Sequence, residues 1–267
     1  MLGFFGSELA NSDVKATNAY GWGVRFNRNS LQSWTIYFLG LMHLGSRIRN
    51  RIVIKILSSL DTSKMTLFDA GCGIALESVR LAPRFKKVVA ADIDSRKTKE
   101  ALRLSRKNSV TNLEIMTADL TKGKATNEKF DVIISLEVIE HVFSDKKFIS
   151  TLDKSLKKDG VIILSSPAKT LLSKIAQKSL DHHQIGYNPE DIKKLLKNTD
   201  LKLVKQYSYG KSILGKVIIA IDFVFKKTVP VLSIFFFPVF YPVLIFDLKL
   251  PTSGIPRGFV SILKKKR

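Results

Sequence analysis

The sequence predicts an α/β fold in which helices cover a mainly parallel sheet. Short apolar runs alternate with helix-length intervals, the pattern of parallel strands joined by crossover helices. The first run leads into a glycine turn at Gly71-Cys72-Gly73, and the second ends on Asp92. A chain of 267 residues with 45% hydrophobic content can bury the core of such a sheet. We predict strands at 66–70, 87–92, 113–116, 130–135, 160–165, 201–207 and 258–263.

The N-terminal part of the chain does not follow this alternation. Residues 1–30 mix Gly, Asn and Ser with scattered aromatics, and we interpret them as a loosely ordered arm. Residues 31–60 have helical spacing, with a predicted break into two helices at Gly45 and Ser46. Three arginines follow that break, at positions 47, 49 and 51. Because charges usually lie outside, we interpret them as a solvent-exposed face, with contact to an anion as the alternative.

The amino-acid composition of the chain indicates which binding partners and which cellular compartment to expect. The formal net charge of +21 favours an anionic partner, such as nucleic acid, an acidic membrane surface or a charged small substrate. The single cysteine, Cys72, excludes an intramolecular disulfide and a cysteine cluster for zinc, which favours a reducing cytoplasm. The apolar stretch Met1–Phe5 is too short for a signal peptide, so we expect a cytoplasmic protein.

Three acids indicate what the glycine turn holds. Asp69 closes the first strand, and Asp92 ends the second, where a carboxylate of a doubly wound fold reaches ribose hydroxyls. Asp119 follows the third strand and could meet an adenine amino group. Ala75 stands where a dinucleotide site would have its third glycine, and no Walker lysine pattern is present. The pattern therefore predicts a cofactor with adenosine but no phosphate.

Five motifs follow one another along the chain: Asp69-Ala70-Gly71-Cys72-Gly73, Asp92, Ala118-Asp119, the stretch from Phe130 to Val142, and the stretch from Leu156 to Pro167. Together they resemble the motifs of class I S-adenosylmethionine-dependent methyltransferases, and most closely those of the small-molecule branch that includes ubiquinone and menaquinone biosynthesis enzymes. The resemblance covers roughly residues 46–209 and the last strand. It implies a Rossmann-like sheet of seven strands, mostly parallel with an antiparallel last strand, and helices on both faces.

The resemblance also implies a cofactor site for S-adenosylmethionine. Gly71 and Gly73 would pass under its methionine half, and Asp69 would support the turn and the amino group. Asp92 would hold the ribose and Asp119 the adenine, although either acid alone could be an ordinary surface residue. The predicted cofactor contacts are Asp69, Ala70, Gly71, Cys72, Gly73, Asp92, Ile93, Asp119, Leu120, Ser135, Leu136 and Glu137.

Methyl transfer requires a nucleophile in line with the sulfonium and a base for its proton. His141 follows the fourth strand and is the candidate base, with orientation of the loop as the alternative role. His182 and His183 are interpreted as loop residues. Glu137, Glu140 and His141 resemble a cluster that holds a divalent metal in some quinone O-methyltransferases. Many relatives carry the same letters without a metal, so we predict no metal site.

A hydrophobic insertion separates the last two predicted strands, over residues 210–256. Residues 228–246 carry no charge over nineteen positions and would span about 28 Å as one helix. Pro230, Pro238 and Pro242 interrupt this run, and both ends must return to one sheet. We therefore predict a re-entrant or in-plane hairpin at a membrane, beside the active site, because the sixth strand leaves from the ligand-binding edge. A soluble lid or a dimer interface is the alternative.

These predictions divide the chain into an arm with a cap helix (1–45), a cofactor-binding core (46–209), the insertion (210–256) and a last strand with a basic tail (257–267). The expected function is methyl transfer, with O-methylation favoured, to a lipid-like, quinone or lipid-linked acceptor at an anionic membrane surface. A nucleic-acid methyltransferase is the alternative, but Glu137 and Glu140 would repel phosphate, so nucleic acid is not the expected partner. A non-catalytic binding protein with the same fold is a further alternative.

Overall fold

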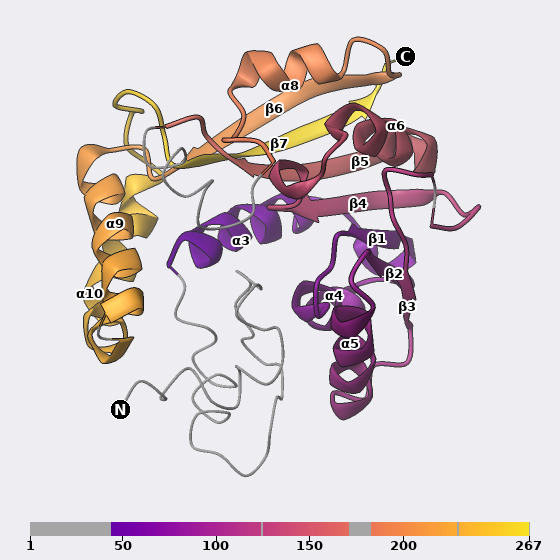
Figure 1. Cartoon of the computed structure of the whole chain (residues 1–267), viewed down its shortest axis with the longest axis horizontal. Helices are drawn as coiled ribbons and strands as arrows, with labels where there is room; N and C mark the ends of the chain where they lie inside the picture. Colours follow the sequence, from indigo (N-terminus) through magenta and orange to yellow (C-terminus); the bar gives the residue numbers. More distant parts are fainter. Residues whose placement is uncertain (1–43, 124, 171–182, 229, 267) are drawn as a thin grey trace.

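A seven-stranded sheet organises the computed structural model, which describes residues 44–123, 125–170, 183–228 and 230–266 (Figure 1). The strands are β1 (Thr66–Ala70), β2 (Lys87–Asp92), β3 (Leu113–Thr117), β4 (Phe130–Leu136), β5 (Leu156–Pro167), β6 (Leu201–Tyr209) and β7 (Gly258–Lys265). Their order across the sheet is β3-β2-β1-β4-β5-β7-β6. β7 is antiparallel to both neighbours and the other pairs are parallel. The predicted fold class and all seven predicted strand positions are confirmed, although β5 begins four residues before its predicted start.

Helices cover both faces of this sheet. They are α3 (Leu44–Leu57), α4 (Leu76–Leu81), α5 (Ser95–Lys107), α6 (Asp145–Ser155), α8 (Pro189–Leu195), α9 (Ile213–Thr228) and α10 (Pro230–Asp247), with 3₁₀ turns η2 (Thr62–Lys64), η3 (Ala82–Arg84) and η4 (Ile139–His141). α8 begins directly after Asn188, whose backbone N–H donates to Asp191 Oδ2 at 2.9 Å in a capping box.

The alternation of side chains along the strands gives the sheet two apolar faces. Leu67 of β1 joins a core with α3, α9 and α10, whereas Phe68 joins a second core with α6 and α8. Val132 and Ile133 of β4 divide between the same two cores. The central strands β1, β2, β4 and β5 are mainly buried on both sides, as expected for parallel strands covered by helices.

The N-terminal predictions need correction at two points. Gly45 and Ser46 lie within α3, so the chain is helical at the predicted break. The predicted arm and the helix before Gly45 lie outside the described residues up to position 43.

The second correction concerns the arginines of α3. Only Arg51 is exposed, whereas Arg47 and Arg49 are each 3% exposed. The Arg47 guanidinium lies over the rings of Phe237 and Tyr241 in α10, at 4.6 and 4.9 Å from their centroids. The solvent-exposed interpretation is wrong for Arg47, which α10 covers, and for Arg49, which is buried beside Asn50 and Glu137.

The insertion folds as a helical hairpin of α9 and α10, which lie side by side at one end of the sheet (Figure 1). Pro238 and Pro242 lie within α10 and do not end it. Asp247 closes the base of the hairpin, where its carboxylate accepts hydrogen bonds from the backbone N–H groups of Lys211 (2.7 Å) and Ser212 (2.8 Å). Within the described ranges, every helix falls short of the length and hydropathy needed to cross a bilayer.

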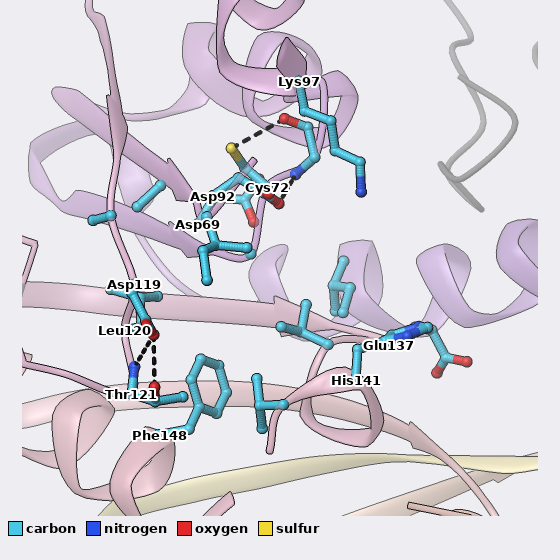
Figure 2. Close-up of a pocket in the computed structure, with 18 of the residues that line it drawn as sticks. Asp69, Cys72, Asp92, Lys97, Asp119, Leu120, Thr121, Glu137, His141 and Phe148 are labelled. Atoms are coloured by element: carbon cyan, nitrogen blue, oxygen red, sulfur yellow. Dashed lines mark hydrogen bonds between the residues drawn. The ribbon is translucent and has the colours of Figure 1, made fainter. Parts of the chain in front are cut away.

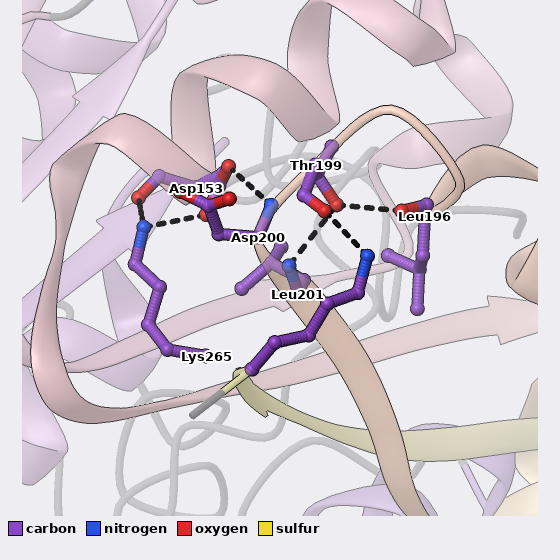
Figure 3. A network of polar contacts seen from close by, with 7 residues as sticks. Asp153, Leu196, Thr199, Asp200, Leu201 and Lys265 are labelled. Carbon is purple, nitrogen blue, oxygen red and sulfur yellow. Dashed lines mark hydrogen bonds and ion pairs between the residues drawn. The ribbon is translucent and has the colours of Figure 1, made fainter.

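A buried ion pair closes the sheet at the opposite end (Figure 3). Lys265 Nζ of β7 lies 2.6 Å from Asp153 Oδ1 and donates to the Asp153 carbonyl oxygen at 2.7 Å. Asp153 Oδ2 also accepts from the backbone N–H of Asp200 at 3.1 Å, just before β6. One carboxylate therefore connects α6, the start of β6 and the end of β7.

Replacing Lys265 with methionine is expected to lower the free energy of unfolding by about 2 kcal/mol, because Asp153 is left buried without its cation. Denaturant unfolding would measure this loss. Lys264→Met is the matched control, since Lys264 is exposed on the same strand. Equal stability of the two variants would contradict the role given to the pair.

Candidate active site

A cavity of about 460 Å³ opens at the carboxyl ends of β1, β2 and β4 (Figure 2). The predicted residues that line it are Asp69, Gly71, Cys72, Gly73, Asp92, Ile93, Asp119, Leu120, Leu136, Glu137 and His141. Two predicted contacts, Ala70 and Ser135, are absent from this lining because both side chains are fully buried in the sheet. In Figure 2 the acids from β1 and β2, Asp119 with Thr121, and Glu137 with His141 occupy three separate parts of the cavity wall.

The glycine turn is possible only without a side chain at its first position. Gly71 has φ of 87°, and a Cβ added there would lie 2.5 Å from Val138. The backbone N–H groups of Gly71 and Cys72 both donate to the carbonyl of Ala91, at 2.8 and 2.9 Å. The turn is thus tied to the end of β2, and its backbone forms the cavity floor.

Asp92 joins the turn to the loop after β2. Its Oδ2 accepts from the backbone N–H of Gly73 at 2.8 Å, and its Oδ1 accepts from that of Asp94 at 3.0 Å. A carboxylate has about four lone-pair directions, so each oxygen keeps one for a ligand. The half-buried Asp92 is therefore oriented and still able to accept two hydroxyl hydrogen bonds, as a ribose offers.

Asp119 lies in a second polar corner. Its Oδ1 accepts from the Thr121 hydroxyl at 2.6 Å and from the Thr121 backbone N–H at 2.9 Å. These hydrogen bonds hold the pKa of Asp119 below its usual value, so the side chain is an ionised acceptor at neutral pH. Leu120 and the 67% exposed Ile93 supply apolar surface beside the carboxylates, as a purine ring requires.

Asp69 differs because it is only 4% exposed. Burial raises its pKa to about 7, against the hydrogen bond that it accepts from Ser78 Oγ at 2.5 Å. The neighbouring carboxylates of Glu77 and Asp92 raise the pKa further. A cationic ligand beside such a carboxyl group would stabilise its ionised form and would bind to it favourably.

Two polar residues that sequence reasoning missed, Arg49 and Glu77, also line the cavity. Arg49 Nε donates to Asn50 Oδ1 at 3.1 Å, and Asn50 Nδ2 donates to Glu77 Oε1 at 2.5 Å. The signal was the spacing in α3, because Arg49 follows Ile48 and lies three residues before Ile52, both on the buried face. Arg49 brings a guanidinium to the methionine end of the predicted site.

The loop after β4 holds Glu137 in an uncommon conformation, with φ of 58°. Its backbone N–H donates to the Ser165 hydroxyl at 3.0 Å. Its Oε1 accepts from the same hydroxyl at 3.1 Å and from the Tyr209 hydroxyl at 3.3 Å, and lies 3.9 Å from Arg49. The carboxylate is therefore held toward β5 and β6, and the backbone of the loop faces the cavity.

His141 ends η4 as an exposed residue of the cavity wall. Its backbone N–H donates to the Val138 carbonyl at 2.9 Å, which fixes the turn that presents the ring. His183 lines the same cavity and packs edge-on against Phe143, with centroids 5.8 Å apart. His182 lies outside the described residues.

Glu140, next to His141 in sequence, is buried, with 1% of its side chain exposed. This burial raises the pKa of Glu140 well above its usual range, and the nearby Glu137 carboxylate raises it further. Within the described ranges, no three His, Cys, Asp or Glu side chains gather as a metal ion would require.

The fold and the site define a class I S-adenosylmethionine-dependent methyltransferase: the strand order, the glycine turn and the acids at the ends of β1, β2 and β3 occur together. The chain belongs to the family described as Methyltransferase domain, which matches residues 61–209.

Relatives and solved structures agree with this family. Ubiquinone biosynthesis O-methyltransferases of Rickettsia prowazekii and Rickettsia typhi are 30% and 32% identical over 168 residues. Each match covers 61% of this chain, and 66% and 67% of those relatives. The crystal structure of a putative sarcosine dimethylglycine methyltransferase from Galdieria sulphuraria has a TM-score of 0.60, at 13% identity and over 82% of this chain and 86% of that one. Magnesium protoporphyrin IX methyltransferase from Synechocystis, with bound SAH, has a TM-score of 0.53, at 21% identity and over 77% and 90% of the two chains.

Proposed function

We propose that this protein transfers a methyl group from S-adenosylmethionine to a hydroxyl of a lipid-like, quinone-related acceptor at an anionic membrane surface. The observation that carries the proposal is an exposed apolar face on the helical hairpin, which leaves β6 at the same edge of the sheet as the cavity described above. The similarity to ubiquinone biosynthesis O-methyltransferases supports the acceptor class.

The cavity offers residues for binding the cofactor and for removing the proton of the acceptor hydroxyl. Asp92 and Asp119 are the acceptors for ribose and adenine, and Asp69 and Arg49 face the charged methionine end. S-adenosylmethionine, when bound, supplies a methyl group on a sulfonium that leaves as a neutral thioether. We propose that His141, which lines the cavity, takes the acceptor hydroxyl proton as the oxygen–methyl bond forms.

The acceptor end of the cavity is apolar. Val142 and Phe143 line the cavity with the neighbouring His141. Phe143 is 86% exposed, so the mouth presents an aromatic ring to an incoming ligand. An aromatic head group with a hydrophobic tail would be in contact with apolar surface throughout this entrance.

The outer face of the hairpin provides the surface for a lipid. In α10, Phe235, Val239 and Phe246 recur at helical spacing and are 73%, 60% and 59% exposed. Pro238 and Pro242 lie on the same exposed side. In α9 the exposed apolar residues are Ile213, Leu214, Val217, Phe223 and Val224. An exposed apolar area of this extent is typical of a membrane or protein contact.

The charges around the hairpin favour an anionic membrane as that contact. Lys249 is exposed at its base, and Lys211 and Lys216 lie partly exposed beside it. Each lysine near an anionic bilayer contributes about 1 kcal/mol. We therefore place the protein peripherally on a membrane from the cytoplasmic side, with α9 and α10 lying in the interface.

The test replaces Phe235, Val239 and Phe246 together with serine. Loss of this apolar area is expected to weaken partitioning to anionic vesicles at least about tenfold. Turnover of a long-chain quinol in those vesicles should fall with it, whereas turnover of a short-chain, water-soluble quinol should be retained. Val204→Ser is the matched control, since Val204 is 52% exposed on β6. Unchanged partitioning of the triple variant would overturn the membrane contact, and transfer to neither quinol by the wild-type protein would overturn the acceptor class.

A further inference from the structure

The helical hairpin packs against α3, a helix that lines the cavity. Ile218 and Ile219 of α9 and Leu244 of α10 are buried in the same core as Leu44 and Ile48 of α3. α3 in turn carries Arg49, which lines the cavity. A change in how the hairpin packs would therefore change the packing of a helix that lines the cavity.

Arg47 forms the first connection between the hairpin and the site. Phe237 and Tyr241 stack on each other at 5.2 Å, and the buried Arg47 guanidinium lies over both rings. A cation over an aromatic ring is stabilising, and more so when both are removed from water. Two residues further along α3, Arg49 lies 3.9 Å from the carboxylate of Glu137.

Tyr209 forms the second connection. It is the last residue of β6, immediately before the segment that leads into α9, and its hydroxyl donates to Glu137 Oε1 at 3.3 Å. Gly258 of β7 leaves room for that hydroxyl, because a Cβ at position 258 would overlap it. Both connections therefore end on the same carboxylate.

Glu137 is sensitive to such connections because its backbone is strained. A left-handed conformation costs a residue with a side chain roughly 1–2 kcal/mol, and it persists only where the surroundings fix it. Here Ser165, Tyr209 and Arg49 surround the Glu137 side chain. The backbone that they hold in place faces the cavity.

We propose that Arg47 is a positioning residue that couples the helical hairpin to the cofactor site. It holds α10 against α3 and so, through Arg49, helps to fix Glu137 in the cavity wall. Binding of lipid by the hairpin and binding of S-adenosylmethionine by the cavity are then energetically coupled. The lipid half of this inference rests on the membrane contact proposed above.

Arg47→Met tests the coupling, because methionine retains much of the apolar bulk and removes the guanidinium. Arg51→Met is the matched control on the exposed side of the same helix. Isothermal titration with S-adenosylmethionine, in buffer and with phosphatidylglycerol-containing vesicles, gives the cofactor Kd of each variant. Vesicles are expected to tighten the wild-type and Arg51→Met Kd about fivefold, within the usual range of coupling between sites. Arg47→Met is expected to bind the cofactor about fivefold more weakly in buffer and to show no vesicle effect.

Vesicle partitioning with and without S-adenosylhomocysteine is a second measurement, because two coupled binding sites must affect each other equally. A merely structural role of Arg47 would leave this coupling unchanged. Saturating S-adenosylhomocysteine must tighten vesicle partitioning by the same factor by which vesicles tighten its own Kd, and the Arg47→Met protein must lack this effect. If Arg47→Met does not fold, Tyr241→Leu removes one of the two rings and should give the same loss of coupling.

The outcomes separate the two proposals. A folded Arg47→Met protein with wild-type Kd values in buffer and in vesicles overturns the role of Arg47. A wild-type protein that does not bind vesicles overturns the membrane contact and the lipid coupling, while the buffer Kd of Arg47→Met still decides whether Arg47 positions the cofactor site.

Discussion

Asp92→Ala is expected to weaken S-adenosylmethionine binding by at least about a hundredfold. The variant loses two hydrogen bonds from ribose hydroxyls to a charged acceptor, each worth about 1.5–3 kcal/mol. It also releases the Gly73 backbone N–H, which Asp92 holds at 2.8 Å, so the glycine turn loses one of its supports. Isothermal titration would measure the Kd directly.

Asp94→Ala is the control for this substitution. Asp94 lies in the same loop and its Oδ1 accepts from the backbone N–H of Arg96 at 2.9 Å at the start of α5, but it does not line the cavity. Its replacement should change stability slightly and the cofactor Kd by less than about threefold. Similar Kd values for the two variants would contradict the assignment of Asp92 to the ribose.

Cofactor affinity is expected to rise with pH between 5.5 and 7.5, by about twentyfold, because Asp69 must ionise to meet the cationic amino group of the cofactor. With a pKa of about 7, few Asp69 side chains are ionised at pH 5.5, and most are at pH 7.5. Asp69→Asn should bind the cofactor weakly and with little dependence on pH. A pH-independent Kd for the wild-type protein would contradict this role.

The raised pKa of Asp69 also makes the stability of the unliganded protein depend on pH, but here a rise in pH is unfavourable. The folded state keeps a proton on Asp69 up to about pH 7, whereas the unfolded chain loses it near 4. Between about pH 4 and pH 7 the folded state therefore binds more protons than the unfolded chain. The protonated Asp69 stabilises the folded state at low pH, and this contribution is lost as the pH rises through 7. Thermal unfolding of the apo protein and the Asp69→Asn variant at pH 5.5 and 7.5 would show the difference.

The sequence was sufficient to predict the sheet and the cavity floor, because both depend on local patterns. Alternating apolar runs specify buried strands, and the residues at their ends, such as Asp69, Asp92 and Asp119, meet at one edge by topology alone. Gly71 was identifiable for the same reason, since a turn with φ of 87° requires glycine. The antiparallel direction of the last strand followed from the resemblance to a family.

The remaining part of the site depends on contacts between distant segments. Arg49 was interpreted as a surface residue because nothing near it in sequence indicates that it lies beside Glu137, which follows a distant strand. Glu137 was predicted from its motif, but its left-handed backbone arises from Ser165 and Tyr209, which lie in other strands. Ser135 was predicted as a cofactor contact from the resemblance to a family, but its side chain is fully buried and does not line the cavity.

The position of β7 has a consequence for the order in which the protein assembles. β7 follows the helical hairpin in sequence, yet it lies between β5 and β6 in the sheet. β6 therefore has no strand to pair with until β7 has been synthesised and has joined β5. Because the hairpin connects β6 to β7, it acquires its final place only at that step, and long-range pairing of this kind is slow. The apolar surface that we assign to the membrane is thus among the last parts of the molecule to form.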